Sequence, residues 1–219
     1  MKKYFVKSKI TGGHYAFKTE KSSKPFTNKM GECKSVQLYP DDIVADIGSY
    51  VGEYSLFALG QGVRKVISFE ATPQTFNLLS YNISRSPYSC NSEAHNKAVV
   101  GTNIKFVDLY ISKGIGVTNS IAKTHGKSDR VRVPAIKYEA AIKDVSVAKI
   151  DVEGAEYSYN IVQPNLRAII LEFHPLVKKP WKKMARQIMQ DNESASFRPI
   201  MKPQFSHGWG DMAGSWVKA

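Results

Sequence analysis

An acidic residue and two glycines lie at a spacing suited to binding a small ligand. In Val44-Ala-Asp46-Ile-Gly48-Ser-Tyr-Val-Gly52-Glu-Tyr54, an apolar run leads into glycines four positions apart and then into a segment of helical character. Glycine lets a backbone approach a ligand closely, and doubly wound α/β folds bind ligands where their strands end. Asp46, at the end of the run, suits a ligand that carries an ammonium or hydroxyl group.

The next apolar run also ends in an acidic residue, Glu70, which follows Val66-Ile-Ser-Phe69. A carboxylate at this place can accept hydrogen bonds from both hydroxyls of a ribose. A nicotinamide dinucleotide would require GxGxxG, a spacing that Tyr50 interrupts, and no phosphate-binding GxxxxGK motif occurs. S-adenosylmethionine carries an ammonium and a ribose but no pyrophosphate, so the pattern predicts this cofactor. We expect it to be held by Asp46, Gly48, Ser49, Tyr50, Gly52, Glu53, Tyr54, Glu70 and Ala71.

Two more acidic residues and a histidine are candidates for acting on a methyl acceptor. Asp151 follows the apolar run Ser146–Ile150, Glu153 lies two positions later, and His174 follows the run that ends at Glu172. Methyl transfer requires an aligned acceptor and the exclusion of water, and an alcohol acceptor also needs a base. Asp151 is the first candidate for orienting or deprotonating the acceptor, and His174, with an ordinary pKa of about 6.5, suits proton acceptance at neutral pH. A structural His174 that caps its strand is the alternative.

The acidic residues at these strand ends admit other roles. Asp151, Glu153 and Glu172 are hard oxygen ligands that could instead hold a divalent metal. Glu172 could also orient His174 or Lys149. Our prediction for this site assigns the three catalytic candidates and no metal.

Apolar runs of strand length alternate with amphipathic stretches, which is typical of repeated βαβ units. The expected core strands are Ile43–Ile47, Lys65–Phe69, about Ala94–Val100, Ser146–Ile150 and Ala168–Glu172. The expected helices are Glu53–Leu59, Pro73–Ile83 with Thr72 as its N-cap, 154–162 and 180–190. These elements predict an α/β, Rossmann-like fold with a mostly parallel sheet flanked by helices.

The chain of 219 residues is long enough for one substantial core and too short to favour two ordinary domains. We expect a β-hairpin extension over residues 1–38 and one catalytic domain over 39–219, with extra strands within 102–142 and closing antiparallel strands in Phe197–Ala219. Aromatic residues of this tail, Phe205–Trp209 and Trp216, could form an acceptor wall, although core aromatics are the commoner explanation.

The chain has a formal net charge of +12, from 31 Lys and Arg against 19 Asp and Glu. Such an excess favours nucleic acid or acidic substrates as partners, while a solvated basic surface explains it equally well. Cys33 and Cys90 form neither a disulfide framework nor a zinc motif. No apolar run approaches the roughly 20 residues of a membrane span, and the first residues lack a signal-peptide core. We therefore expect a soluble cytoplasmic protein.

Four stretches resemble the FkbM-type S-adenosylmethionine-dependent methyltransferases. They occur in the family's order and are Asp46–Tyr54, Phe69–Pro73 with Leu79–Ile83, Lys149-Ile-Asp-Val-Glu-Gly-Ala-Glu156 and Leu171-Glu-Phe-His174. The third is the most specific. Ser49-Tyr50 replaces the family's usual Ala-Asn, and Glu70-Ala71 its usual Glu-Pro. The resemblance implies a class I methyltransferase fold and O-methylation, often of sugars or natural products.

Three functions stay open at this point. The first is O-methylation of a carbohydrate or other small acceptor. The second is ribose 2'-O-methylation of a nucleic acid, for which Lys149, Asp151 and Glu172 partly match a Lys-Asp-Lys-Glu tetrad and the net charge could neutralise phosphates. The third is a basic binding scaffold that has lost catalysis, against which the intact Asp46, Glu70 and Asp151 argue. No motif for methylating exocyclic amines or cytosine carbon occurs.

Overall fold

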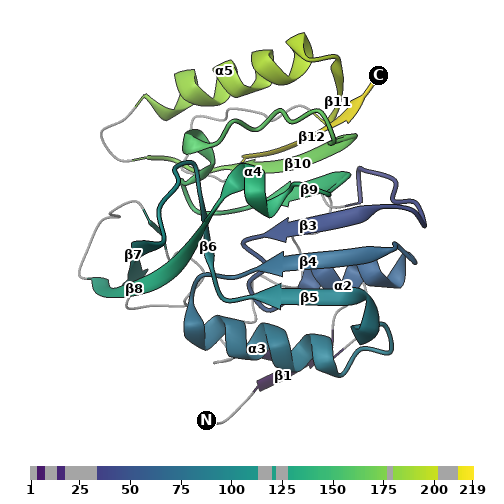
Figure 1. The fold of residues 1–219 in the computed structure, drawn as a ribbon, viewed down its shortest axis with the longest axis vertical. Helices are drawn as coiled ribbons and strands as arrows, with labels where there is room; N and C mark the ends of the chain where they lie inside the picture. Colours follow the sequence, from purple (N-terminus) through teal and green to yellow (C-terminus); the bar gives the residue numbers. More distant parts are fainter. Residues whose placement is uncertain are drawn as a thin grey trace.

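Five parallel strands, four of them apolar, lie side by side at the centre of the molecule (Figure 1). The computed structural model describes residues 4–7, 14–17, 34–112, 120–121, 128–176, 180–201 and 212–219. The parallel strands, in their order across the sheet, are β10 (Ala168–Phe173), β9 (Val147–Ile150), β3 (Ile43–Ile47), β4 (Lys65–Phe69) and β5 (Ser92–His95). The predicted α/β architecture with a mostly parallel sheet is confirmed.

Two antiparallel strands extend this sheet beyond β10. Strand β12 (Met212–Lys218) pairs with β10, and β11 (Phe197–Met201) pairs with β12 at the sheet edge. The expected closing strands of the tail are therefore present. Trp216 on β12 is fully buried in the core, as in the alternative that we gave for it. Phe205–Trp209 lies outside the described residues.

Helices cover both faces of the sheet. Successive side chains of each strand point to opposite faces, so both faces carry apolar side chains that need cover. Helix α2 (Glu53–Gly60) packs on one face against Val44, Val66 and Ile170. The opposite face, with Ile47, Ile150 and their neighbours, is covered by α4 (Tyr138–Ala141) and α5 (Trp181–Ser194). Helix α3 (Pro73–Ser84) lies near β5, and the short 3-10 helix η2 (Ser89–Asn91) precedes that strand (Figure 1).

A small second sheet lies beside the carboxyl ends of the central strands (Figure 1). It is made of β6 (Ala98–Val100), β8 (Ser128–Lys137) and β7 (Phe106–Ser112), in that order. The prediction of extra strands within 102–142 is confirmed. The predicted single strand at 94–100 is wrong, because the chain leaves the central sheet at Asn96, whose side-chain amide donates to the carbonyl oxygens of Glu70 and Ala71.

The helix predicted at 154–162 is also wrong, since only the 3-10 turn η3 (Glu156–Ser158) forms there. Tyr159, which follows this turn, has an extended backbone with φ −91° and ψ 145°, so no helix continues beyond Ser158. The other three predicted helices, α2, α3 and α5, begin at or within a residue of their predicted starts, whereas α4 was not predicted. Thr72 precedes α3, although its side chain makes no capping hydrogen bond.

The amino-terminal strands β1 (Tyr4–Lys7) and β2 (His14–Phe17) pair antiparallel as the expected hairpin. Ala16 is buried against Val51 and Leu78, and its backbone N–H donates to Asn82 Oδ1 on α3 at 2.9 Å. The division into an extension and a domain at residue 38 stays a prediction. Among the helices that the structure describes, none has the length and apolar character needed to cross a membrane.

Candidate active site

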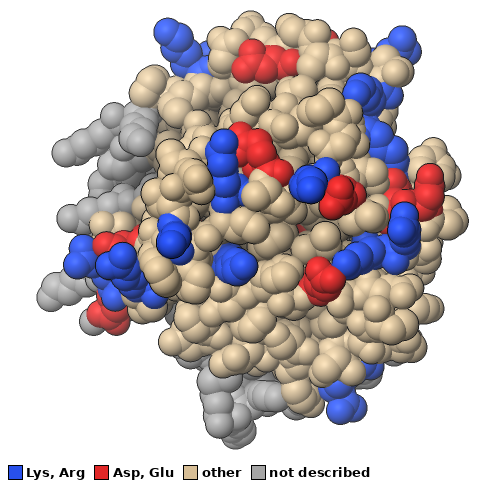
Figure 2. All heavy atoms as spheres, in the orientation of Figure 1, with Lys and Arg blue, Asp and Glu red and all other residues tan. Residues whose placement is uncertain are grey.

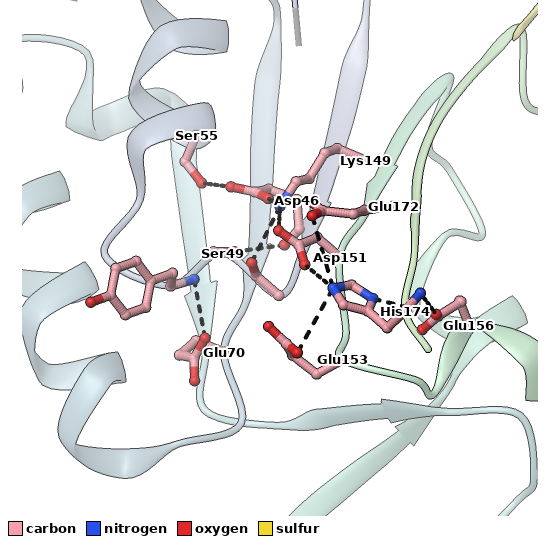
Figure 3. A network of polar contacts seen from close by, with 12 residues as sticks. Asp46, Ser49, Ser55, Glu70, Lys149, Asp151, Glu153, Glu156, Glu172 and His174 are labelled. Carbon is pink, nitrogen blue, oxygen red and sulfur yellow. Dashed lines mark hydrogen bonds and ion pairs between the residues drawn. The ribbon is translucent and has the colours of Figure 1, made fainter. Parts of the chain in front are cut away.

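The carboxyl ends of β3, β4, β9 and β10 meet at one edge of the sheet and bring most of the predicted residues together (Figure 3). The strands stay tied at this edge, because the Gly48 N–H donates to Phe69 O and the Asp151 N–H donates to Ile47 O, both at 2.9 Å. Residues that follow different strands thus become neighbours. The edge has a side around Glu70 and a side around Asp151, with Asp46 between them.

Glu70 lies beneath the loop that follows β3. Its Oε2 accepts the backbone N–H of Tyr50 at 3.1 Å, and its Oε1 accepts that of Thr72 at 2.8 Å (Figure 3). Burial raises the pKa of this carboxyl group to about 7, although both N–H donors oppose the rise. A carboxylate fixed by backbone groups at this position suits the two hydroxyls of a ribose.

Asp46 is fully buried, so its side chain is not exposed to a ligand. Its Oδ2 accepts the Ser55 hydroxyl at 2.6 Å, which ties the end of β3 to α2. Its Oδ1 has no hydrogen-bond partner among the described residues and lies 3.7 Å from Lys149 Nζ. Burial raises the pKa of Asp46, and Lys149 and Ser55 oppose that rise. Asp46 therefore holds a buried acceptor oxygen ready beneath the cofactor loop.

The two glycines of the loop are required by the protein's own packing. Both have positive φ angles, 81° at Gly48 and 92° at Gly52. A Cβ at Gly48 would lie 1.7 Å from the carbonyl oxygen of Asp151, and a Cβ at Gly52 would lie 2.7 Å from Leu79 Cδ1. The space beside each glycine is thus filled by the fold, a reason that the sequence interpretation did not include. Ser49 closes the loop by donating to Asp46 O at 2.6 Å.

The other predicted cofactor residues differ in what they contribute near this edge. Tyr50 contributes its backbone N–H and has a left-handed φ of 51°. Glu53 begins α2 and is half-buried, and the Tyr54 side chain is buried in the core with Val44 and Val66. Ala71 packs toward the small second sheet.

Asp151 is the best-placed group on the acceptor side. Its Oδ2 lies 3.0 Å from Lys149 Nζ, and its Oδ1 lies 3.4 Å from His174 Nε2. Glu153 and Glu172 approach the same ring nitrogen at 3.8 and 4.0 Å. The three catalytic candidates and Glu172 therefore form one cluster (Figure 3).

His174 is held from behind by Glu156, whose side chain is fully buried. Glu156 Oε1 accepts the backbone N–H of His174 at 2.8 Å and lies 3.3 Å from Nδ1, while Oε2 accepts the Gly154 N–H at 2.8 Å. Burial lowers the pKa of His174, but the surrounding carboxylates, Glu156 first, raise it to about 10. The ordinary pKa that we expected for His174 is wrong for this environment, because these carboxylates favour the protonated imidazole.

Three residues that build this site were not among the residues that we predicted for it. Glu156 orients His174, Asn96 holds the loop after β4, and Ser55 anchors Asp46. Glu156 ends the most specific block of the family resemblance, which was a usable signal. Lys149 lies in the buried strand Val-Ala-Lys-Ile and links Asp46 to Asp151. We had considered it only as a residue oriented by Glu172 or as part of a tetrad.

A comparison with known protein families shows which family the chain belongs to. The family model described as "Methyltransferase FkbM domain" matches residues 42–199, which is most of the sequence. The chain belongs to the FkbM methyltransferase family. No curated protein sequence matches it.

Solved structures share the fold of this FkbM family member. Methyltransferase FkbM from Methylobacillus flagellatus KT has a TM-score of 0.54 and 10% identity, over 92% of this chain and 48% of that one. TYW2 from P. horikoshii, solved with MeSAdo, has a TM-score of 0.52 and 13% identity over 94% and 69%. TrmK from M. capricolum, solved with S-adenosylhomocysteine, has a TM-score of 0.50 and 8% identity over 85% and 66%. The chain spans about half the length of the Methylobacillus protein.

S-adenosylmethionine is the cofactor of the FkbM family, and the residues at the sheet edge fit it. Glu70 is a buried carboxyl group of the kind that can accept hydrogen bonds from ribose hydroxyls. Asp46 Oδ1, a buried acceptor without a hydrogen-bond donor among the described residues, adds negative charge beneath the loop, which suits a cationic cofactor. When bound, the cofactor supplies an electrophilic methyl group.

Proposed function

We propose that this FkbM family member is an S-adenosylmethionine-dependent O-methyltransferase that acts on a hydroxyl of a carbohydrate or other small acceptor. The observation that carries the proposal is the meeting of two unlike acidic sides at one sheet edge. One side, around Glu70, is built from buried backbone-fixed groups, and the other, around Asp151, is partly open. The first suits a cofactor and the second an acceptor.

On the cofactor side, this chain provides the loop 48–54 and Glu70 for binding. The Glu70 carboxylate orients the ribose, and Asp46 acts through Ser55 and Lys149 as a positioning residue for the loop. Gly48 and Gly52 keep the loop in its left-handed turns. These groups bind and orient the cofactor.

On the acceptor side, Asp151 is the group that contacts the hydroxyl. About 30% of its side chain is exposed, whereas only 5% of the His174 side chain is, so His174 lies behind it. Lys149 holds Asp151 Oδ2, and the carboxylate orients the hydroxyl and accepts its proton. Glu153 borders the same loop in a left-handed conformation, which is a strained arrangement typical of functional sites. His174 acts through Asp151 as a positioning residue.

Ribose methylation of a nucleic acid is the second candidate, and the net charge of +12 favours it. On the face drawn in Figure 2, the Lys and Arg residues that the structure describes are interspersed with Asp and Glu rather than joined in one continuous stripe. This distribution favours a small acceptor. A catalytically inactive scaffold is the third candidate.

The test is a methyl-transfer assay with mass-spectrometric detection on a panel of sugars, small alcohols and structured RNA. We expect methylation of a hydroxyl on a small acceptor, lost in Asp151→Asn and retained in Glu93→Gln, which alters an exposed carboxylate on β5. Methylation of RNA alone, with binding that weakens steeply as salt increases, would instead establish the second candidate. A protein that binds cofactor and methylates nothing in the panel contradicts both enzyme proposals and favours the scaffold.

A further inference from the structure

The imidazole Nε2 of the nearly buried His174 points toward a group of three carboxylate oxygens (Figure 3). Nε2 lies 3.4 Å from Asp151 Oδ1, 3.8 Å from Glu153 Oε2 and 4.0 Å from Glu172 Oε1. All three distances exceed the 2.7–3.2 Å of an ordinary N–H···O hydrogen bond. The nitrogen is thus aimed at the centre of the group without a normal hydrogen bond to any of these three members.

The spacing of these atoms fits shared coordination better than it fits direct bonding. Ligand atoms about 2.1 Å from one cation lie about 3.0 Å apart at a right angle and about 4.2 Å apart when opposite. One ligand atom each from Asp151, Glu172 and His174 all lie within 4.8 Å of one another. Small side-chain movements would therefore bring the three atoms to one cation.

Glu156 provides a second observation that is independent of the carboxylates in front of the ring. It lies on the opposite side of His174, where its Oε1 is 3.3 Å from Nδ1 and also fixes the backbone N–H. Histidines that bind metals usually donate their other ring N–H to a carboxylate or carbonyl, which fixes the tautomer and the ring direction. The Glu156 contact fixes His174 with Nε2 toward the three oxygens.

We infer that Asp151, Glu172 and His174 form a binding site for one divalent cation that accepts mixed nitrogen and oxygen ligands, with Glu153 as a further oxygen donor. The function of the cation, though not its binding, rests on the proposed function. A cation at this edge would act as a Lewis acid on the acceptor hydroxyl. Asp151 Oδ2 lies 3.0 Å from Lys149 Nζ, and Oδ1 is the oxygen that faces His174 Nε2.

The charges of the cluster support a divalent cation. Five carboxylates, of Asp46, Asp151, Glu153, Glu156 and Glu172, surround Lys149 and His174 (Figure 3). Acidic side chains thus outnumber the basic ones in this cluster. The imidazole ligand favours Mn²⁺ or Zn²⁺ over Ca²⁺, which prefers oxygen ligands.

The experiment is titration of the chelator-treated full chain with Mn²⁺, followed by electron paramagnetic resonance, in the absence of cofactor. We expect one Mn²⁺ per chain, with affinity at least tenfold weaker in Glu172→Gln and in Asp151→Asn. Glu93→Gln is the matched control, because it removes an exposed carboxylate on β5, and should leave the affinity unchanged. Glu156→Gln should weaken binding by about tenfold or more through the ring orientation. Nitrogen hyperfine coupling to the bound Mn²⁺ should be present in the wild type and absent in His174→Gln.

Circular dichroism of each variant shows whether it folds, and two ligand variants guard against the failure of one. No saturable Mn²⁺ binding by the wild type, or equal binding by every folded ligand variant, would overturn the site. S-adenosylhomocysteine binding is measured separately on the same samples. Mn²⁺ binding without S-adenosylhomocysteine binding would contradict the proposed function and leave the cation site intact, and the reverse result would contradict the cation site alone.

Discussion

Replacing Glu70 by glutamine should change how the stability of the protein depends on pH. Burial raises the Glu70 pKa from 4.5 to about 7 in the folded state. The folded chain therefore holds this proton more tightly than the unfolded chain does. The resulting stabilisation is fully present below the unfolded pKa and is lost as the pH rises from about 4.5 to about 7. A difference of about 2.5 pKa units at about 1.4 kcal/mol per unit amounts to about 3.5 kcal/mol over the whole titration, of which about 3 kcal/mol falls between about pH 4.5 and about pH 7.5.

Urea unfolding followed by tryptophan fluorescence measures this effect. We expect the stability of the wild type relative to Glu70→Gln to fall by about 3 kcal/mol between about pH 4.5 and about pH 7.5. Glu93→Gln is an informative control, because the Lys65 ammonium lowers the pKa of this exposed carboxyl group and gives its pH dependence the opposite sign. Parallel stability profiles for the wild type and Glu70→Gln would refute the assignment of Glu70 as a buried, proton-binding group.

Three further substitutions test the loop and the acceptor side. Gly48→Ala should lower the free energy of unfolding by at least about 2 kcal/mol, because the new Cβ meets the Asp151 carbonyl. The control Gly60→Ala, with open space around it, should be neutral or stabilising. A small effect at Gly48 would contradict the packing. Glu153→Gly should raise stability by about 1 kcal/mol by relieving its left-handed backbone, and should lower turnover in the transfer assay; a loss of stability would show that no strain is stored there. Asp151→Asn should lower kcat about 100-fold or more while S-adenosylhomocysteine affinity stays the same, and unchanged turnover would exclude Asp151 as the base.

Much of the fold could be predicted from the sequence because its strands are short, apolar and separated by helices. β3 and β4 have the predicted bounds, and α3 begins at Pro73 as expected. The failures have local physical causes. The strand at 94–100 divides where Asn96 binds the loop after β4, a contact between residues far apart in sequence. The helix at 154–162 is replaced by one 3-10 turn, because the backbone becomes extended at Tyr159.

The sequence predicted which residues form the site better than it predicted what each of them does. Strand-end position alone brought Glu70, Asp151 and His174 together. The sequence could not show that Asp46 is completely buried or that the space at Gly48 is filled by the Asp151 carbonyl, since both depend on how β3 and β9 pack. The raised pKa of His174 depends in the same way on carboxylates from separate segments.

Calorimetric titration of the purified chain with S-adenosylhomocysteine tests the central claim most directly. Wild type, Glu70→Ala and the exposed-carboxylate control Glu93→Ala should be compared at slightly alkaline pH, where Glu70 is ionised. We predict binding at one site per chain, lost in Glu70→Ala and unchanged in Glu93→Ala. Absence of binding by the folded wild type, or equal affinity in Glu70→Ala, would contradict the assignment of this sheet edge as the cofactor site.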